Sequence, residues 1–295
     1  MAGSMIKNIA FIGAGLMGAP MTKRLLSAGF GVRVWNRTVA KLGPLLAAGA
    51  ELATSPADAA RGTDAVLVCL SDAEALEAVL FSEQGVSDGV DSPSILIDFS
   101  TIGPGPTITF AQRLQARCGT SWVDAPVSGG AIGAEQGKLV VFCGGSTADI
   151  ETVSPILRAI GQRYTRIGDL GAGQALKLCN QLIVASNLVA IAEALALARA
   201  SHLKLSALPD ALAGGFADSL PLQIFGRRMA AGNSEPVLGE LGLMLKDLRA
   251  IDELARAGGC RLPLKDAALE IYVRAAERGL LRQDLSALFS LYSGA

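Results

Sequence analysis

The sequence contains a single histidine, His202, among its 295 residues. A metal site with several histidine ligands, or a catalytic triad with a histidine base, would have to use that one residue. The five cysteines are scattered and none forms a Cys-x-x-Cys pair, so neither a zinc site nor a disulfide framework is indicated. We therefore expect chemistry without a bound metal ion, and free cysteines of the kind found in a reducing compartment.

Charged residues are also scarce, at 18% of the chain, and the net charge is only −1. The chain thus lacks the basic character that nucleic-acid binding requires. Its longest runs without a charged residue, 8–22 and 178–192, each span 15 residues. A membrane-spanning helix needs roughly 20 apolar residues, so none is expected. Because the N-terminal residues contain no apolar signal-peptide core, we expect a cytoplasmic protein without a nucleic-acid or membrane partner.

The first half of the chain alternates strand and helix patterns. Helices are expected over 16–28 and 72–80, and Ser55-Pro56 is typical of another helix start. This alternation predicts right-handed βαβ units in a doubly wound α/β sheet of the Rossmann type. The apolar runs that are typical of strands buried on both faces are 6–12, 32–35, 65–70, 95–98, 122–125 and 139–143.

The pattern changes after about residue 167. Apolar residues then recur at helical spacing over 171–200, 244–257 and 263–277, and no credible strand appears past Thr165. The 51% hydrophobic content predicts a large buried core, and a chain of this length predicts two domains. We therefore expect an α/β domain over 1–167 and an all-α domain over 168–295.

A glycine motif follows the first predicted strand and opens the first predicted helix. Gly13 permits the tight turn, Gly15 lets the backbone approach a pyrophosphate, and Gly18 lets helix and strand pack closely. We therefore expect a dinucleotide at this helix N-terminus, whereas a glycine-rich turn without a ligand is the alternative. The residues of this turn are Gly13, Ala14, Gly15, Leu16, Met17 and Gly18.

The end of the second predicted strand indicates which dinucleotide binds. NAD enzymes place Asp or Glu there, but this chain has Asn36, Arg37 and Thr38. Arg37 offers a charged fork of donors to a 2′-phosphate, and Thr38 adds a hydroxyl. We therefore expect NADP(H) in preference to NAD(H), with use of NAD(H) left open. An exposed loop arginine without a ligand is the alternative interpretation.

Two further segments carry polar residues suited to catalysis. The turn Ser128–Gly130 offers a hydroxyl and N–H groups that suit a carboxylate, although a plain tight turn fits equally well. Lys177 and Asn180 share one face of an apolar helix. Because a buried ammonium is costly unless it is paired or functional, Lys177 is a candidate proton donor with Asn180 as its partner. The alternative is a lysine whose amine reaches water at a domain boundary.

In order and spacing, these motifs resemble those of the β-hydroxyacid dehydrogenase family over nearly the whole chain. The resemblance implies a Rossmann domain joined by a long helix to an all-α domain, in a homodimer or homotetramer. It also implies reduction of a small aldehyde acid to a hydroxy acid. The matching segments are GAGLMGAPM at 13–21, DFST at 98–101, DAPVSGG at 124–130, GDLGAGQALKLCNQ at 168–181 and KDL at 246–248.

The resemblance further implies roles at the matching positions, with Lys177 as the catalytic lysine. Two departures concern the cofactor: IGPG follows DFST, and Asn36-Arg37 replaces the acidic residue of NAD-preferring members. On the residues alone Lys246 fits a solvated helix face, and the resemblance reverses that interpretation. The implied substrate contacts are Ser128, Gly129, Gly130 and Asn180, and the implied cofactor contacts beyond the glycine turn are Leu70, Ser71, Thr101 and Lys246.

Within the family, the segment 168–198 and the GGF at 214–216 most resemble tartronate semialdehyde (2-hydroxy-3-oxopropionate) reductases. A 3-hydroxyisobutyrate dehydrogenase, or a glyoxylate or succinic semialdehyde reductase, is an alternative. An imine reductase shares the architecture but usually lacks the lysine found at Lys177. A non-catalytic dinucleotide-binding module would need neither that lysine nor the Ser128–Gly130 turn.

Overall fold

The computed structural model describes residues 6–91 and 94–292. The first five residues, on which part of the signal-peptide argument rests, lie outside this range. The chain divides into two compact units, Met1–Lys177 and Leu178–Ala295. The division thus falls after Lys177 rather than after residue 167, because the start of the long helix is bonded to the first unit, as described below.

The first unit contains one sheet with the strand order β3-β2-β1-β4-β5-β6-β8-β7, and β9 also pairs with β8. Neighbours from β3 to β6 are parallel, whereas β8 is antiparallel to both β6 and β7. All six predicted strands are present. The strands are β1 (Asn8–Ile12), β2 (Gly31–Trp35), β3 (Glu51–Leu52), β4 (Ala65–Val68), β5 (Ile95–Asp98), β6 (Ser121–Asp124), β7 (Val127–Ser128), β8 (Leu139–Gly144) and β9 (Gly161–Gly168).

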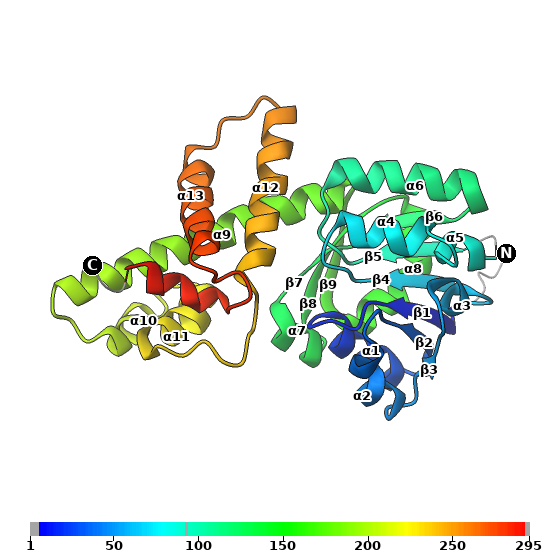
Figure 1. The fold of residues 1–295 in the computed structure, drawn as a ribbon, viewed down its shortest axis with the longest axis horizontal. Coiled ribbons are helices and arrows are strands. Elements are labelled where there is room, and N and C mark those ends of the chain that lie inside the picture. Colours follow the sequence, from blue (N-terminus) through cyan, green and yellow to red (C-terminus); the bar gives the residue numbers. More distant parts are fainter. Residues whose placement is uncertain (1–5, 92–93, 293–295) are drawn as a thin grey trace. The chain divides into compact units, whose positions relative to one another are not determined.

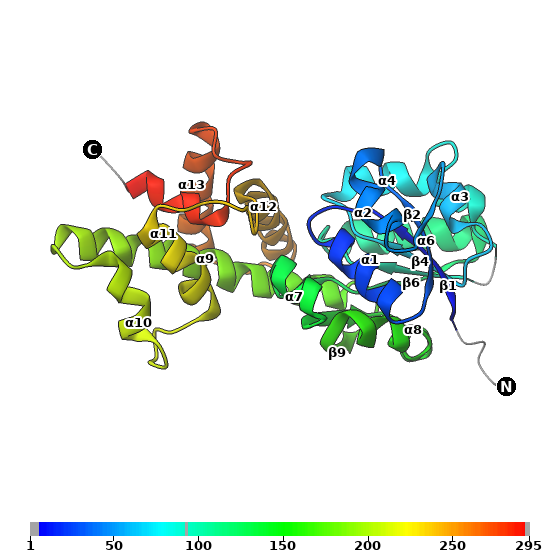
Figure 2. The ribbon, with the colours of Figure 1, turned by 90° about the horizontal axis from the view of Figure 1, so that it is seen from below.

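Helices cover both faces of this sheet. Phe11 on β1 belongs to the same core cluster as Met21, whereas the next residue, Ile12, packs on the opposite face with Leu76. Figure 1 shows α4 and α6 on one side of the sheet and α1 on the other, and Figure 2 shows α1 beside α7 and α8. The sheet is doubly wound, as predicted. The helices are α1 (Gly18–Ser27), α2 (Gly43–Leu46), α3 (Pro56–Ala60), α4 (Ala73–Phe81), α5 (Val86–Gly89), α6 (Pro104–Cys118), α7 (Gly130–Gln136) and α8 (Thr147–Ile160).

Local capping explains where two of these helices begin. The Ser55 hydroxyl accepts a hydrogen bond from the Asp58 N–H, so Ser55 caps α3 and Pro56 occupies the first turn, as predicted. Asp72 accepts from the Ala75 N–H in the same way, so α4 begins one residue later than expected. Both caps lie in loops at the carboxyl edge of the sheet, and they fix the entry of the chain into each helix.

The second unit is helical, and the described residues in it form no strand of their own. Its core combines α9 with the C-terminal helices, and α12 and α13 lie side by side (Figure 1). A helix over 263–277 is confirmed at both ends. The elements are α9 (Ala172–Ala200), α10 (Leu208–Leu212), α11 (Arg227–Ala231), α12 (Leu241–Ala257) and α13 (Pro263–Glu277), with short 3-10 or π segments at 205–207, 222–226 and 285–292.

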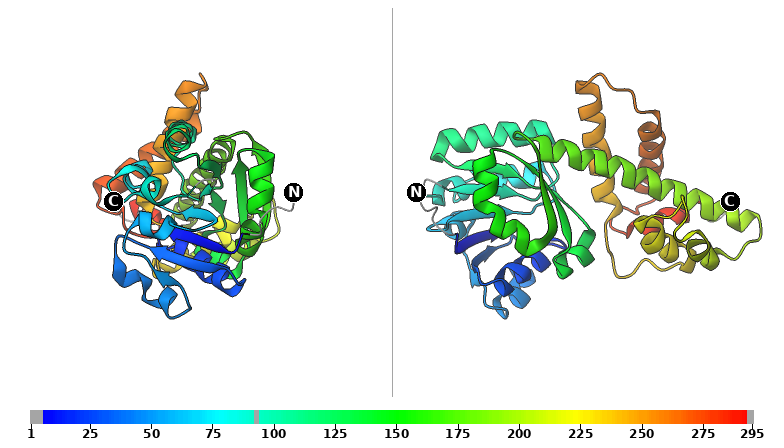
Figure 3. Two further views of the ribbon diagram at one scale, coloured as in Figure 1. Left: turned by 90° about the vertical axis from the view of Figure 1, so that its right-hand side faces the viewer. Right: turned by 180° about the vertical axis from the view of Figure 1, so that it is seen from behind.

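The long helix α9 joins the two units and appears unbroken in Figure 3. By length and composition alone it could cross a membrane, since its most apolar 18-residue window has a mean hydropathy of 1.8. The uncharged run 178–192 ends before Glu193, so a search for uncharged runs alone did not identify this helix as a candidate span. A membrane-spanning window tolerates a few charged residues. The core helix of a soluble protein passes the same test, and Leu188 and Leu195 of α9 are fully buried in the second unit.

Candidate functional site

A pocket of about 490 Å³ opens in the first unit at the carboxyl ends of β1, β2 and β4. The strand order reverses between β1 and β4, and ligands of open α/β sheets bind at such a switch point. Thr54, Ser55, Ser82, Glu83 and Gln84 also line the pocket, and the sequence motifs did not indicate them. The residues predicted to contact a cofactor that line it are Gly13, Gly15, Asn36, Arg37, Thr38, Leu70 and Ser71.

The three motif glycines have different surroundings. A Cβ atom on Gly13 would lie 2.3 Å from the Cys69 carbonyl oxygen, and one on Gly18 would lie 1.8 Å from the Gly13 carbonyl oxygen. These two glycines are therefore required by the packing of the protein itself. A Cβ atom on Gly15 would meet no atom within 4 Å, although Gly15 lines the pocket. The backbone at Gly15 thus leaves a cradle that suits a pyrophosphate.

The start of α1 offers donors to that cradle. Within the described chain, no hydrogen bond occupies the N–H groups of Gly15, Leu16 and Met17, and no side chain caps the helix. Such N–H groups and the positive end of the helix dipole together favour a phosphate. The Ala14 N–H differs, because it donates to the Asn36 Oδ1 atom at 3.0 Å. Asn36 in turn donates to the Thr38 carbonyl at 2.8 Å, so its amide holds the two pocket loops together.

The loop after β2 gives one end of the pocket a positive character. Arg37, Thr38 and Lys41 all line the pocket there, and Arg37 and Lys41 are basic residues. Glu83, which also lines the pocket, is a carboxylate that comes from the loop after α4. The side chains of Arg37 and Thr38 both offer hydrogen-bond donors at this end of the pocket.

The loop after β5 carries Thr101, which is not among the residues lining this pocket. The preceding residue, Ser100, accepts a hydrogen bond from the Leu70 N–H at 2.9 Å, so this loop is tied to the loop after β4. Gly103 has a φ of +82° and Pro104 occupies the first turn of α6. The unusual IGPG stretch is therefore the start of a helix, where glycine and proline both fit.

The predicted catalytic lysine lies beside the predicted substrate turn. The Lys177 Nζ atom donates to the Val127 carbonyl at 2.8 Å, and Lys177 is only 8% exposed. Val127 directly precedes Ser128 at the end of β7. Gly129 and Gly130 follow with φ values of +131° and +63°, which only glycine adopts readily. No hydrogen bond within the described residues occupies the N–H groups of these two glycines.

A buried carboxylate fixes the start of α9 on the sheet. Asp124, at the end of β6, accepts hydrogen bonds from the Gly171 and Gln174 N–H groups, each at 2.8 Å. Burial raises the pKa of Asp124, and these N–H bonds act in the opposite direction. A Cβ atom on Gly173 would lie 2.3 Å from the Phe142 carbonyl oxygen, so glycine is needed for this close approach. Lys177 is thereby held in the first unit.

Asn180 and Lys246 belong to the second unit, where one network connects them. Asn180 donates to the Gln181 Oε1 atom at 3.0 Å, and Gln181 donates to the Asp247 Oδ2 atom at 2.5 Å. The Lys246 Nζ atom lies 3.1 Å from the Asp247 Oδ1 atom. Asp247 is only 4% exposed, so this buried carboxylate joins α9 to α12 at the residues that the sequence singled out.

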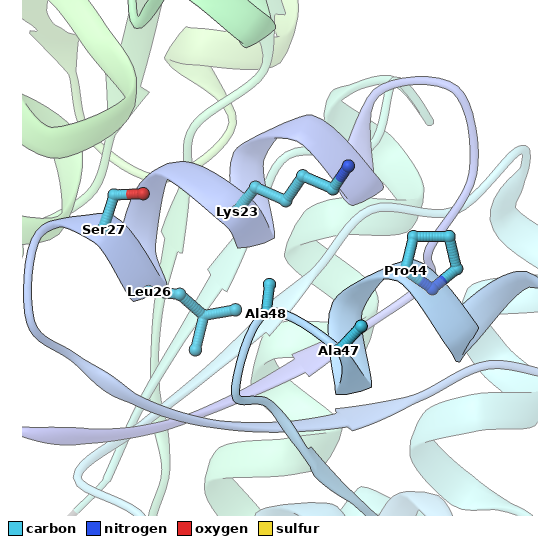
Figure 4. A pocket seen from close by; sticks show the side chains of 6 residues that line it. All are labelled: Lys23, Leu26, Ser27, Pro44, Ala47 and Ala48. Atoms are coloured by element: carbon cyan, nitrogen blue, oxygen red, sulfur yellow. The ribbon is translucent and has the colours of Figure 1, made fainter.

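Another pocket of the first unit, about 420 Å³ in volume, lies between α1 and the segment containing α2 (Figure 4). Lys23 and Ser27 are the polar side chains in its lining, and both are exposed. No convergent set of polar groups makes it a reaction site. Among the described residues, no group of three or more His, Cys, Asp or Glu side chains is placed to hold a metal ion.

Two family models match the chain, one over each half. Residues 8–168 match the model of the NAD-binding domain of 6-phosphogluconate dehydrogenase. Residues 171–292 match the model described as NAD-binding of NADP-dependent 3-hydroxyisobutyrate dehydrogenase. The junction between the two matches lies close to the domain boundary expected from the sequence.

Among curated proteins, the 2-hydroxy-3-oxopropionate reductase of Escherichia coli K12 is 34% identical, and the alignment covers 95% of each chain. The NAD-dependent L-serine dehydrogenase of Pseudomonas aeruginosa is 31% identical over 97% of this chain and 98% of its own. The crystal structure of a 3-hydroxyisobutyrate dehydrogenase from Salmonella typhimurium superposes with a TM-score of 0.90 at 29% identity, covering 97% of this chain and 99% of that one.

Matches of this length and identity, over both halves of the chain, confirm the resemblance that the motifs indicated. The relatives named here act on different small molecules, so the family and the reaction class are shared more widely than the substrate. The chain belongs to the β-hydroxyacid dehydrogenase family and is an NAD(P)-dependent oxidoreductase of small hydroxy acids.

Proposed function

We propose that this enzyme uses NADP(H) to reduce a small aldehyde acid, and that its substrate is tartronate semialdehyde (2-hydroxy-3-oxopropionate), which becomes glycerate. The observation that carries the proposal is the 2.8 Å contact between the Lys177 Nζ atom and the Val127 carbonyl. It puts an ammonium next to a turn with a hydroxyl and two glycine N–H groups that no hydrogen bond from the described part of the chain occupies. This arrangement supports the proposal of a proton donor beside a carboxylate site.

In this proposal, residues of the first unit bind the phosphate groups of the cofactor. The N–H groups of Gly15, Leu16 and Met17 bind the pyrophosphate, while Arg37 and Thr38 bind the 2′-phosphate. When bound, the nicotinamide supplies the hydride for the carbonyl carbon. The loop after β2 therefore determines whether the enzyme prefers NADP(H) or NAD(H).

The substrate is held and protonated by the residues at the end of β7 and on α9. Ser128, Gly129 and Gly130 bind its carboxylate and so orient the carbonyl group. Lys177 gives a proton to the carbonyl oxygen as negative charge develops there, and its positive charge stabilises that oxygen. Asn180 contacts the substrate from the next turn of α9, and Thr101 and Lys246 contact the cofactor.

The substrate is best tested by a matrix of steady-state kinetics. NADPH and NADH are each combined with tartronate semialdehyde, methylmalonate semialdehyde, succinic semialdehyde and glyoxylate, and L-serine is tested with NADP⁺ and NAD⁺. We expect the highest kcat/KM for tartronate semialdehyde with NADPH. A higher kcat/KM for another aldehyde acid, or for L-serine with NAD⁺, would identify that compound as the substrate instead. Turnover of cyclic imines alone would indicate an imine reductase, and no turnover despite NADPH binding would indicate a non-catalytic module.

We also propose that the enzyme works in the cytoplasm as a homodimer or homotetramer, without a membrane or nucleic-acid partner. Large apolar side chains on α9, Ile183 and Leu197, are 68% and 69% exposed in the single chain, which supports burial against a second copy. Light scattering coupled to size-exclusion chromatography tests this. A mass of about two or four chains is expected, and a monomer at micromolar concentration would contradict it.

A further inference from the structure

Gln174 is fully buried and lies one turn before Lys177 on α9. All three hydrogen bonds of its side-chain amide go to one loop, the loop after β5. The Oε1 atom accepts from the Ile102 N–H at 3.1 Å and from the Gly103 N–H at 3.2 Å. The Nε2 atom donates to the Ser100 carbonyl at 2.8 Å. The amide thus attaches the start of α9 to this loop over 70 residues away in sequence.

The loop that Gln174 holds is the one that carries Thr101. Ser100 and Ile102, on either side of Thr101, are both bonded by the same amide. The main chain at Gln174 is held separately, because its N–H donates to Asp124 on β6. The first turn of α9 therefore has two independent attachments, one to the end of β6 and one to the Thr101 loop.

Building on the role proposed above for Lys177, we propose that Gln174 is a positioning residue that sets the spacing between the Thr101 loop and the Lys177 ammonium. Thr101 is proposed to contact the cofactor and Lys177 to protonate the substrate. A hydrogen-bonded amide fixes both the distance and the direction between the two segments. An apolar side chain of similar size would fill the space but would hold the segments by packing alone. A misplacement of about 1 Å can lower a rate about 100-fold.

The test compares Gln174→Met with Thr107→Val in the reduction of tartronate semialdehyde by NADPH. Thr107→Val is a matched control, because the buried Thr107 hydroxyl donates to the Gly103 carbonyl at 2.9 Å in the same loop without reaching α9. We expect Gln174→Met to lower kcat about 100-fold while the KM for NADPH changes less than about threefold. Thr107→Val should keep kcat within about threefold of the wild type, since it leaves the link to α9 in place.

A second variant, Gln174→Glu, separates positioning from a purely structural role. A neutral glutamic acid at position 174 can make the same hydrogen bonds as the glutamine amide. Its O–H donates to the Ser100 carbonyl, and its other oxygen accepts from the N–H groups of the loop. The ionised side chain has no proton to donate to the Ser100 carbonyl. In this variant kcat should therefore be highest in acid and fall as the introduced carboxyl ionises, whereas Gln174→Met shows no such added dependence. Circular dichroism across the pH range checks that both variants stay folded.

The proposal is overturned if both Gln174 variants keep wild-type kcat while Lys177→Ala loses turnover, or if folded Gln174→Glu lacks the added pH dependence. If Gln174→Met fails to fold, the pH profile of kcat in Gln174→Glu alone decides whether Gln174 is a positioning residue. Retained turnover in Lys177→Ala is a different failure, because it refutes the function proposed for Lys177 itself.

Discussion

The glycines of the turn 13–18 differ in the space around them, and the consequence of that difference can be measured. Gly15→Ala adds a methyl group that meets no protein atom, so the unfolding midpoint should stay within about 2 °C of the wild type. The same methyl group occupies the phosphate cradle, so the Kd for NADPH should rise at least about tenfold. Fluorescence titration with NADPH and thermal unfolding measure the two effects.

Gly18→Ala provides the opposite comparison. Its methyl group would collide with the Gly13 carbonyl, so this variant should lose stability or fail to fold before any effect on binding is seen. If Gly15→Ala instead bound NADPH as tightly as the wild type, the cradle would not be the pyrophosphate site.

Arg37 is the residue that we propose to determine the preference for NADP(H). Arg37→Ala removes a charged donor from the end of the pocket, and hydrogen bonds to charged groups contribute about 1.5–3 kcal/mol each. The KM for NADPH should therefore rise by about one to two orders of magnitude, while the KM for NADH changes little. Steady-state kinetics with both cofactors measure the ratio, and equal losses would rule out a contact with the 2′-phosphate.

Single residues differ in how far the sequence reveals their roles. Lys177 is conspicuous because an ammonium on an apolar helix is costly without a purpose, and the structure brings it to the predicted substrate turn. Gln174 and Asp124 are not conspicuous, because their partners lie far away in the chain. The signal that could have found Gln174 is its place one turn before Lys177 on the same apolar helix.

Among the strands, burial explains which ones could be predicted from the sequence. The strands with continuous apolar sequences, such as β1 and β4, were predicted from their composition. β3 and β7 have only two residues each, which is too short for a periodic pattern. β9 was missed because it is largely exposed and polar, and it extends three residues past Thr165, where the expectation of no further strand was wrong.

An ion pair between α12 and α13 gives the second unit a defined pH dependence. Hydrogen bonds to Asp252 and then Asp266 raise the pKa of Lys265, and the bond to Lys265 lowers the pKa of Asp252. The contribution of Asp252 is present above its ordinary value of 3.8 and is lost as pH falls through its lowered pKa. The contribution of Lys265 is present below 10.5 and is lost as pH rises through its raised pKa.

We therefore expect Lys265→Met to lower the thermal unfolding midpoint by on the order of 4 °C between pH 5 and pH 9. The difference from the wild type should shrink below pH 3.8. The exposed Lys204 provides the control, because Lys204→Met should change the midpoint much less. An equal effect of Lys265→Met at pH 3 and pH 7 would show that packing, rather than the ion pair, accounts for the loss.

For the whole molecule, the sequence indicated a Rossmann-type α/β first half followed by a helical second half, and this fold is confirmed. The boundary differs in detail because helix α9 begins within the first unit, where Asp124 holds its N-terminus. Of the predicted site residues, Lys177 and the Ser128–Gly130 turn belong to the first unit, and Asn180 and Lys246 belong to the second. Only the three-dimensional structure reveals the carbonyl and carboxylate contacts that hold each group.

Lys177 is the proposed proton donor to the substrate, and the Lys177→Ala variant shows whether turnover depends on it. The measurement pairs kcat for tartronate semialdehyde reduction with the Kd for NADPH, and uses Lys7→Ala as a control at the exposed amino end of the β1 segment. We predict that kcat falls about 100- to 10,000-fold in Lys177→Ala, while NADPH binding stays within about threefold of the wild type. Wild-type turnover in Lys177→Ala, with NADPH still bound, would contradict the claim.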